Sequence, residues 1–199
     1  MKKLNFVLLC LGIGFLQACN SGSTDSVDAA KDANEKKDSP AMTIPKDTNT
    51  VVSTTPVDKG DADFAVEAAN GGMMEVALGN YAQQNALSQR VKDFGAMMVR
   101  DHTKAGDELK QIAAAKNITL PADLGAEAKK DVDDLMKKKG KDFDKAYMNM
   151  MVDDHKKDVK EFEKAAKDCK DIEIKGFAEK TLPVLQVHLD SSKAIAGKN

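Results

Sequence analysis

"MMVRDHTK" (residues 97–104) returns as "MMVDDHKK" (residues 150–157), so the pattern Met-Met-Val-x-Asp-His-x-Lys occurs twice in a chain of 199 residues. Both copies lie in long segments whose apolar residues recur every three or four positions, which is the spacing of an amphipathic α-helix. On such a helix the second methionine and the histidine of each copy are four residues apart and share one face. Each copy therefore predicts a helix that turns a histidine towards the core.

Four long helices and one short helix are predicted around these segments. The chain lacks Trp and is rich in Ala, Lys, Glu, Met and Leu, as all-α proteins are. Pro121 and Gly125 interrupt the pattern before a short amphipathic helix, "AEAKKDVDDLMKKK". The link between the second and third long helices is long enough to cross a bundle, so we expect an all-α, ferritin-like four-helix bundle whose crossover carries a short extra helix. The long helices are expected at residues 62–83, 87–116, 141–168 and 173–196.

All three histidines of the chain are expected to face the core at one level. His102, His155 and His188 fall on the apolar faces of the second, third and fourth long helices. At 1.5 Å per residue, His155 and His188 both stand roughly 25 Å from the turn that joins their helices. In the first long helix, Glu75 lies one turn beyond the small residues "AANGG" of positions 68–72, and its side chain leans towards the same level.

Six side chains form the candidate cluster, and three aspartates surround it. Asp101 and Asp154 lie about 100° round the helix from the histidine that follows each of them. They could hydrogen-bond a histidine on a neighbouring helix and fix its tautomer, and Asp158 lies near His155 in the same outer layer. The cluster itself comprises His102, His155, His188, Glu75, Met98 and Met151.

Two interpretations of this cluster stay open. Imidazoles with a carboxylate or thioethers could hold one Cu, Zn or Fe ion, and the thioethers would favour Cu(I). Alternatively, histidines satisfied by aspartates and methionines at helical spacing form a structural polar core. Because both features are common in structural cores, we favour the structural interpretation from the sequence alone.

No enzyme class is indicated by the motifs. Ferritin-like di-iron oxidases carry Glu-x-x-His on two helices, and the chain has no Glu-x-x-His. A nucleophile elbow, a phosphate loop and a pair of catalytic carboxylates are also absent from the sequence. The 30 basic and 32 acidic residues nearly balance, and no basic patch points to a nucleic-acid partner. We therefore expect a non-enzyme, and the sequence indicates no protein partner.

The N-terminus predicts a membrane anchor made of lipid. Residues 1–18 combine a lysine pair with an apolar run too short to span a bilayer, which is typical of a secretory signal. The segment ends in "LQAC", which resembles the lipobox of bacterial lipoproteins and implies cleavage before Cys19 and acylation of that residue. Asn20 is not the aspartate that retains such lipoproteins at the inner membrane, so the resemblance implies the outer membrane.

The segment that follows the lipobox is polar, contains three prolines and has no aromatic residue. Such a composition cannot bury enough surface to offset the entropy of ordering the chain. We therefore expect three parts: a signal peptide at 1–18, a lipidated cysteine with a disordered tether at 19–60, and the bundle domain at 61–199.

Four stretches of the chain carry a resemblance to a known family. They are "GGMMEVALGNYAQQNA", "VKDFGAMMVRDHTKAGDELK", "FDKAYMNMMVDDHKKDVKEFEKAAKD" and "IKGFAEKTLPVLQVHL", within residues 61–195. The chain resembles the domain of unknown function 4142 family, bacterial envelope proteins with a ferritin-like bundle. The resemblance implies fold and compartment but no reaction. We expect an envelope lipoprotein with a binding or structural role, and metal binding or storage is the alternative.

Replacing Cys19 tests the anchor. Cys19→Ala removes the only thiol that the lipobox can acylate, so we expect the protein to leave the membrane fraction while its helical circular dichroism is unchanged. Cys10→Ala is the matched control, because Cys10 follows Leu9 rather than a small residue, and it should stay membrane-bound. If the Cys19→Ala protein still pellets with membranes and resists a salt wash, the chain is not anchored by lipid at this position.

Overall fold

The computed structural model describes residues 25–38 and 57–197, which form six α-helices and no strand. The predicted all-α class is confirmed. The largest differences from the predicted helix ends are at the start of α2, at Lys59 rather than residue 62, and at the end of α4, at Met136 rather than residue 139. The helices are α1 (Ser26–Asp38), α2 (Lys59–Asn85), α3 (Gln89–Ala115), α4 (Ala126–Met136), α5 (Gly140–Asp168) and α6 (Ile172–Ala196).

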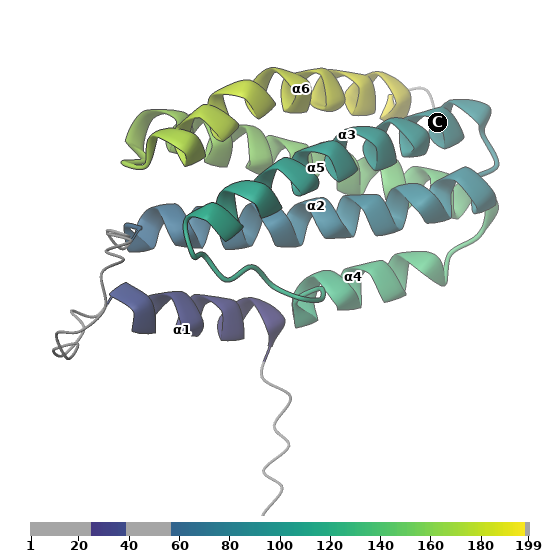
Figure 1. The fold of residues 1–199 in the computed structure, drawn as a ribbon. Coiled ribbons are helices and arrows are strands. Elements are labelled where there is room, and N and C mark those ends of the chain that lie inside the picture. The colour runs from purple at the N-terminus through teal and green to yellow at the C-terminus, as the bar shows by residue number, and fades with distance from the viewer. Residues whose placement is uncertain (1–24, 39–56, 198–199) are drawn as a thin grey trace, which may run out of the picture.

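The four long helices pack as two hairpins. α2 packs along α3, α5 packs along α6, and the two hairpins meet where α3 lies against α6 and α2 against α5 (Figure 1). The crossover after α3 passes through α4, which lies on α2 before the chain enters α5. None of the helices in the described ranges is both long enough and apolar enough to cross a membrane.

Apolar side chains form two separate clusters along the bundle. One cluster gathers around Leu78, Phe94 and Tyr147, near the end where α2 turns into α3. The other gathers around Leu109 and Phe177, towards the end where α5 turns into α6. The level between them is the level at which the histidines were expected, so apolar side chains flank the polar centre on both sides.

Each of the two hairpin turns is held by a buried aspartate from the other hairpin. Asp144 of α5, 4% exposed, accepts the backbone N–H groups of Leu87 at 3.0 Å and Ser88 at 2.7 Å. Asp61 of α2, 3% exposed, accepts those of Lys170 at 2.9 Å and Asp171 at 2.7 Å. Helix starts leave backbone N–H groups without partners, and a carboxylate satisfies them while its charge suits the helix dipole. These contacts fix the heights of the hairpins relative to each other.

Two glycines bring α2 and α3 unusually close together. A Cβ placed on Gly95 would lie 2.7 Å from the backbone oxygen of Gly79, and a Cβ on Gly79 would lie 2.7 Å from the oxygen of Gly95. Side chains larger than hydrogen are therefore excluded at both positions. Gly79 is one turn from Glu75, and Gly95 is two turns from His102, so this contact also sets how near those two side chains come.

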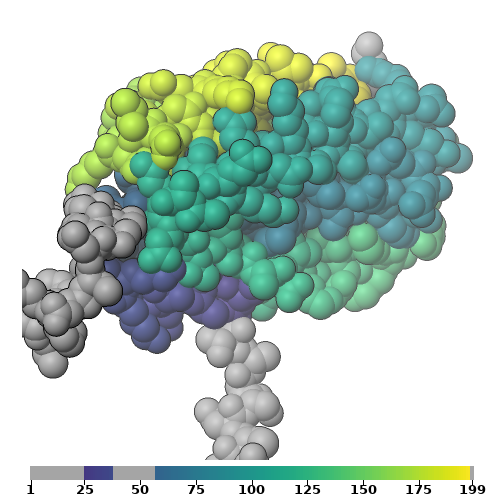
Figure 2. Space-filling model, in the orientation of Figure 1, coloured from purple at the N-terminus to yellow at the C-terminus, as the bar shows by residue number. Residues whose placement is uncertain are grey.

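The segment at 19–60 was predicted to be disordered, and this prediction is wrong for Ser26–Asp38. These residues form α1, which packs on α2 and lies against the crossover and α4 (Figures 1 and 2). Ala30 is 2% exposed and Asn34 8% exposed, so α1 has a buried face. The predicted signal peptide, Cys19 and residues 39–56 lie outside the described residues.

Polar contacts with the crossover explain why composition did not reveal α1. The Asn34 side chain donates to the Thr119 carbonyl at 2.9 Å and accepts the Thr119 N–H at 2.7 Å. Lys37 donates to the Asn117 carbonyl at 2.8 Å, and Lys31 forms an ion pair with Glu67. Helix α1 has few large apolar residues, so these polar contacts hold it in place. They also satisfy backbone groups of the crossover that would otherwise hydrogen-bond to water.

A pair of glycine substitutions on α3 tests the close contact. Gly95→Ala places a methyl group against the α2 backbone, so we expect the free energy of unfolding to fall by about 1–3 kcal/mol. At Gly106 an added Cβ meets nothing within 4 Å. Gly106→Ala should therefore raise the free energy of unfolding by up to about 1 kcal/mol, because alanine has the higher helix propensity. Urea denaturation of both variants measures the difference. Equal effects of the two substitutions would contradict a steric role for Gly95.

Candidate metal centre

Each of the four long helices contributes one side chain to a buried polar centre. Glu75 comes from α2, His102 from α3, His155 from α5 and His188 from α6. The glutamate is 2% exposed, His155 and His188 are at most 1% exposed, and His102 is 8% exposed. The ring centroids of the three histidines lie 5.2–5.8 Å apart. The sequence-predicted residues of this level therefore lie together.

Two of the histidines carry their ring proton on Nδ1, as their hydrogen-bond partners require. His102 Nδ1–H donates to Glu75 Oε2 at 2.8 Å. His155 Nδ1–H donates to the Met151 carbonyl at 2.8 Å, one turn earlier in α5. A carbonyl only accepts, so a neutral His155 has its lone pair on Nε2.

His188 has the opposite tautomer, and a charged pair fixes it. Its Nε2–H donates to Asp101 Oδ2 at 3.0 Å, which leaves the lone pair of a neutral ring on Nδ1. Arg100 donates to both oxygens of Asp101 at 2.7 Å, and this guanidinium, with His188, holds the pKa of Asp101 down at about 2. Asp101 is thus an anion that orients the imidazole from outside, as carboxylates do around metal-bound histidines.

The nitrogens that remain lie close to one another with no proton between them. His155 Nε2 lies 3.3 Å from His188 Nδ1 and 3.2 Å from Glu75 Oε1. With the tautomers above, both are contacts between acceptors, which agrees with the lack of a hydrogen-bond partner for the buried Oε1. His102 Nε2 is also buried without a partner in the described part of the chain. Electron pairs so close together repel each other unless a cation lies between them.

The spacing of these atoms suits a small metal ion. In a tetrahedral site with metal–nitrogen bonds of 2.0–2.1 Å, two ligand atoms lie about 3.3–3.4 Å apart. The separations of 3.3 Å and 3.2 Å around His155 Nε2 are close to this value. One nitrogen from each of His102, His155 and His188 lies within 4.8 Å of the other two. Three imidazoles from three helices thus provide ligands, and the free oxygen of Glu75, on the fourth helix, lies 3.2 Å from His155 Nε2.

Glu75 and two of the three histidines have the protonation state that a metal ion requires. Burial lowers the pKa of His155 and lowers that of His188 to about 4, so both rings are neutral at pH 7. Burial would raise the pKa of Glu75, but the histidines, His102 above all, keep it below its ordinary value. Burial would also lower the pKa of His102, and the Glu75 carboxylate raises it instead. One ionised carboxylate therefore faces two neutral imidazoles and one imidazole that tends to hold a proton.

The other predicted site residues take different places. Met98 and Met151 are fully buried in the apolar cluster around Phe94, and Met151 reaches the centre through its carbonyl oxygen. Asp154 has a buried oxygen with no hydrogen-bond partner among the described residues, and burial raises its pKa to about 7. Asp158 offers an oxygen within 4.8 Å of ligand atoms of Glu75 and His155.

Sequence reasoning missed Arg100, which completes the outer contacts of His188. Its signal lies in the difference between the two copies of the repeated segment. The first copy reads Val-Arg-Asp-His and the second Val-Asp-Asp-His, so only Asp101 has a cation beside it. Accordingly Asp101 is held as an anion, whereas burial raises the pKa of Asp154.

Comparisons with known proteins identify a family and a fold. The sequence model of a family described as Domain of unknown function (DUF4142) matches residues 47–195. Among solved structures, a crystal structure of a DUF305 fragment from Deinococcus radiodurans matches with a TM-score of 0.64 at 9% sequence identity. The match covers 72% of this chain and 99% of that chain, and at this identity it concerns the fold alone. No curated protein matches the chain.

The tautomers can be observed directly. In the metal-free protein near pH 7, ¹⁵N NMR of the imidazoles should show the proton of His155 on Nδ1 and that of His188 on Nε2. Asp101→Leu removes the acceptor of the His188 proton, so its preference for Nε2 should be lost. The control Asp93→Leu removes an exposed carboxylate on the same helix and should leave the spectrum unchanged. A proton on His155 Nε2 in wild type would contradict the convergence of lone pairs.

Proposed function

Since the chain belongs to the family described as Domain of unknown function (DUF4142), whose description names no activity, we propose a function from the geometry of the buried centre. The protein binds one divalent transition-metal ion between His102, His155 and His188, with Glu75 as the fourth ligand. The observation that carries this proposal is the set of buried acceptor atoms that converge at 3.2–3.3 Å around His155 Nε2.

A structural polar core accounts less well for the same contacts. It leaves His102 Nε2 and Glu75 Oε1 buried without partners, and each such group costs about 1–3 kcal/mol. It also places two imidazole lone pairs 3.3 Å apart. An ion satisfies all of these atoms at once, and it explains why each imidazole is oriented by a hydrogen bond on its other nitrogen.

The ligand set favours Zn²⁺ among the ions considered. Imidazole suits Zn, Cu and Fe, whereas Cu(I) prefers soft thioether or thiolate ligands. The two methionines expected near the histidines pack within an apolar cluster, so thioether ligation has no support from their packing. Four protein ligands from rigid helices would leave no coordination position open. This resembles a structural or storage site more than a catalytic site, which keeps one position for water.

The setting of this function is proposed from the sequence. The lipobox supports a lipid anchor at Cys19 in the bacterial envelope, at the outer membrane and facing the periplasm or the surface. The crossover after α3 and the four long helices support a ferritin-like arrangement. A bundle held at a membrane and carrying a buried ion fits metal binding or storage there.

Metal titration of the full chain tests the proposal. The protein is purified in detergent without a histidine tag, stripped with a chelator and titrated with Zn²⁺, Cu²⁺ and Fe²⁺. We expect one Zn²⁺ per chain and a rise in melting temperature, equivalent to about 2.7 kcal/mol when free Zn²⁺ is 100 times Kd. His102→Leu should abolish both effects, because a ligand is lost.

Met98→Leu is the matched control, since it changes the same face of α3 one turn away and keeps a similar volume. It should bind Zn²⁺ as wild type does. Loss of binding in Met98→Leu would show that a thioether is a ligand. Wild type that binds no ion and shows no change in melting temperature would establish the structural polar core instead.

A further inference from the structure

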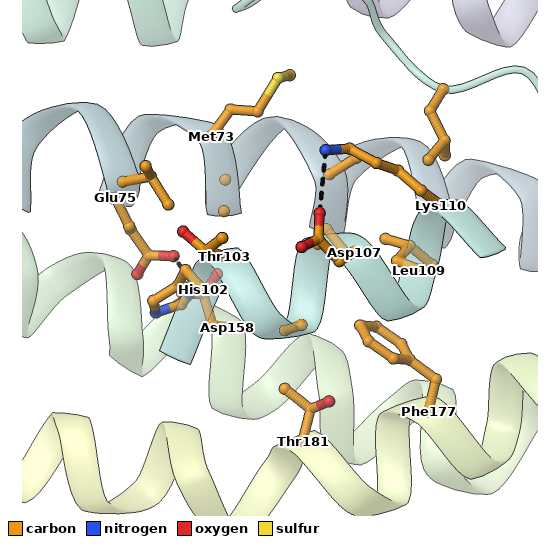
Figure 3. A pocket seen from close by; sticks show the side chains of 18 of the residues that line it. Met73, Glu75, His102, Thr103, Asp107, Leu109, Lys110, Asp158, Phe177 and Thr181 are labelled. Carbon is orange, nitrogen blue, oxygen red and sulfur yellow. Dashed lines mark hydrogen bonds and ion pairs between the residues drawn. The ribbon is translucent and has the colours of Figure 1, made fainter. Parts of the chain in front are cut away.

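A cavity of about 610 Å³ opens onto one side of the metal centre (Figure 3). Its walls are mainly apolar, with side chains such as Leu109, Phe162 and Phe177. At the inner end it reaches Glu75 and His102, and Gly71 and Gly72 of α2 leave the space open. An added Cβ at Gly71 would meet nothing within 4 Å. The centre is therefore buried in the bundle but is not sealed from every direction.

Asp158 stands where this cavity meets the centre. Its side chain lines the cavity together with Glu75 and His102 (Figure 3), and no hydrogen bond or ion pair to it occurs among the described residues. One oxygen of Asp158, one of Glu75 and one nitrogen of His155 lie within 4.8 Å of one another. Glu75 Oε1 is itself buried, and no residue in the described ranges gives it a hydrogen bond. Two carboxyl oxygens and an imidazole nitrogen are ligand atoms that a divalent cation accepts.

His155 belongs both to this group and to the three-histidine group. Its Nδ1 is engaged with the Met151 carbonyl, so only Nε2 is free to bind an ion. One nitrogen lone pair cannot serve two ions at the same time. The two groups are therefore alternative positions for one ion, and they are joined by the ligand that they share.

We propose that divalent cations reach the three-histidine centre through this cavity and bind first between Asp158, Glu75 and His155. This inference rests on the proposed function and adds the path by which the ion enters. Transfer to the final position exchanges the Asp158 oxygen for nitrogens of His102 and His188, while His155 and Glu75 stay bound. No bond is formed or broken other than those to the ion.

Rates of Co²⁺ binding test the route, because the visible absorption of Co²⁺ reports its ligands. The full chain in detergent is mixed with Co²⁺ in a stopped-flow instrument, and release is measured with excess chelator. Gly71→Leu fills the cavity without a clash at Cβ, so it should slow association and release equally, by about tenfold or more, and leave Kd unchanged. Asp158→Asn should slow association by a similar factor while the absorption spectrum of bound Co²⁺ remains that of wild type.

Asp153→Asn is the matched control, since Asp153 lies on the same helix with its side chain 76% exposed. Its rates should equal those of wild type. Wild-type rates in both Gly71→Leu and Asp158→Asn would overturn the route and leave the metal centre standing. A changed spectrum in Asp158→Asn, or two Co²⁺ per wild-type chain, would overturn the single-ion transfer. Wild type that binds no Co²⁺ at all would instead contradict the proposed function.

Discussion

The carboxylate of Glu75 is the constraint on which the centre of this bundle depends. A charged group that is 2% exposed is expensive to bury unless partners compensate for it. His102 donates to one of its oxygens, and His155 lies 3.2 Å from the other. The surrounding histidines keep the pKa of Glu75 below its ordinary value in spite of burial. The glutamate therefore needs positive charge nearby. The three histidines surround it and can supply that charge, either as a proton on a ring or as a metal ion that they bind.

Such a centre requires four helices to be held at the correct heights, and the fold has dedicated contacts for this. The glycine contact at Gly79 and Gly95 fixes the distance between α2 and α3. Asp144 and Asp61 each tie a turn of one hairpin to a helix of the other. Apolar clusters flank the polar level on both sides, and one of them also lines the cavity that reaches it. Because low dielectric strengthens every interaction among charges, these apolar surroundings make buried unpaired atoms costly and would make a bound ion stabilising.

Helical periodicity predicted the all-α class and the inward positions of the histidines, because burial of an apolar face is a property of each helix alone. The sequence also predicted that Asp101 could fix the tautomer of a histidine on a neighbouring helix, but not that this histidine is His188. Composition failed for Ser26–Asp38, because α1 is held by side-chain contacts to the backbone of a distant loop. The cavity beside Asp158 likewise depends on how separate helices meet. The features that the sequence did not predict all depend on contacts between separate helices and loops, whereas the features that it did predict depend on the residue pattern within one helix.

The repeated segment has two different outcomes in the same fold. In the first copy Asp101 is an anion that pairs with Arg100 and orients His188. In the second copy Asp154 has no such cation, and burial raises its pKa to about 7.

X-ray absorption spectroscopy of the Zn²⁺-loaded protein tests the central claim most directly. The account predicts three imidazoles and one further light-atom ligand at about 2.0–2.1 Å. A sulfur ligand at about 2.3 Å, or a shell of water oxygens without imidazole scattering, would contradict it.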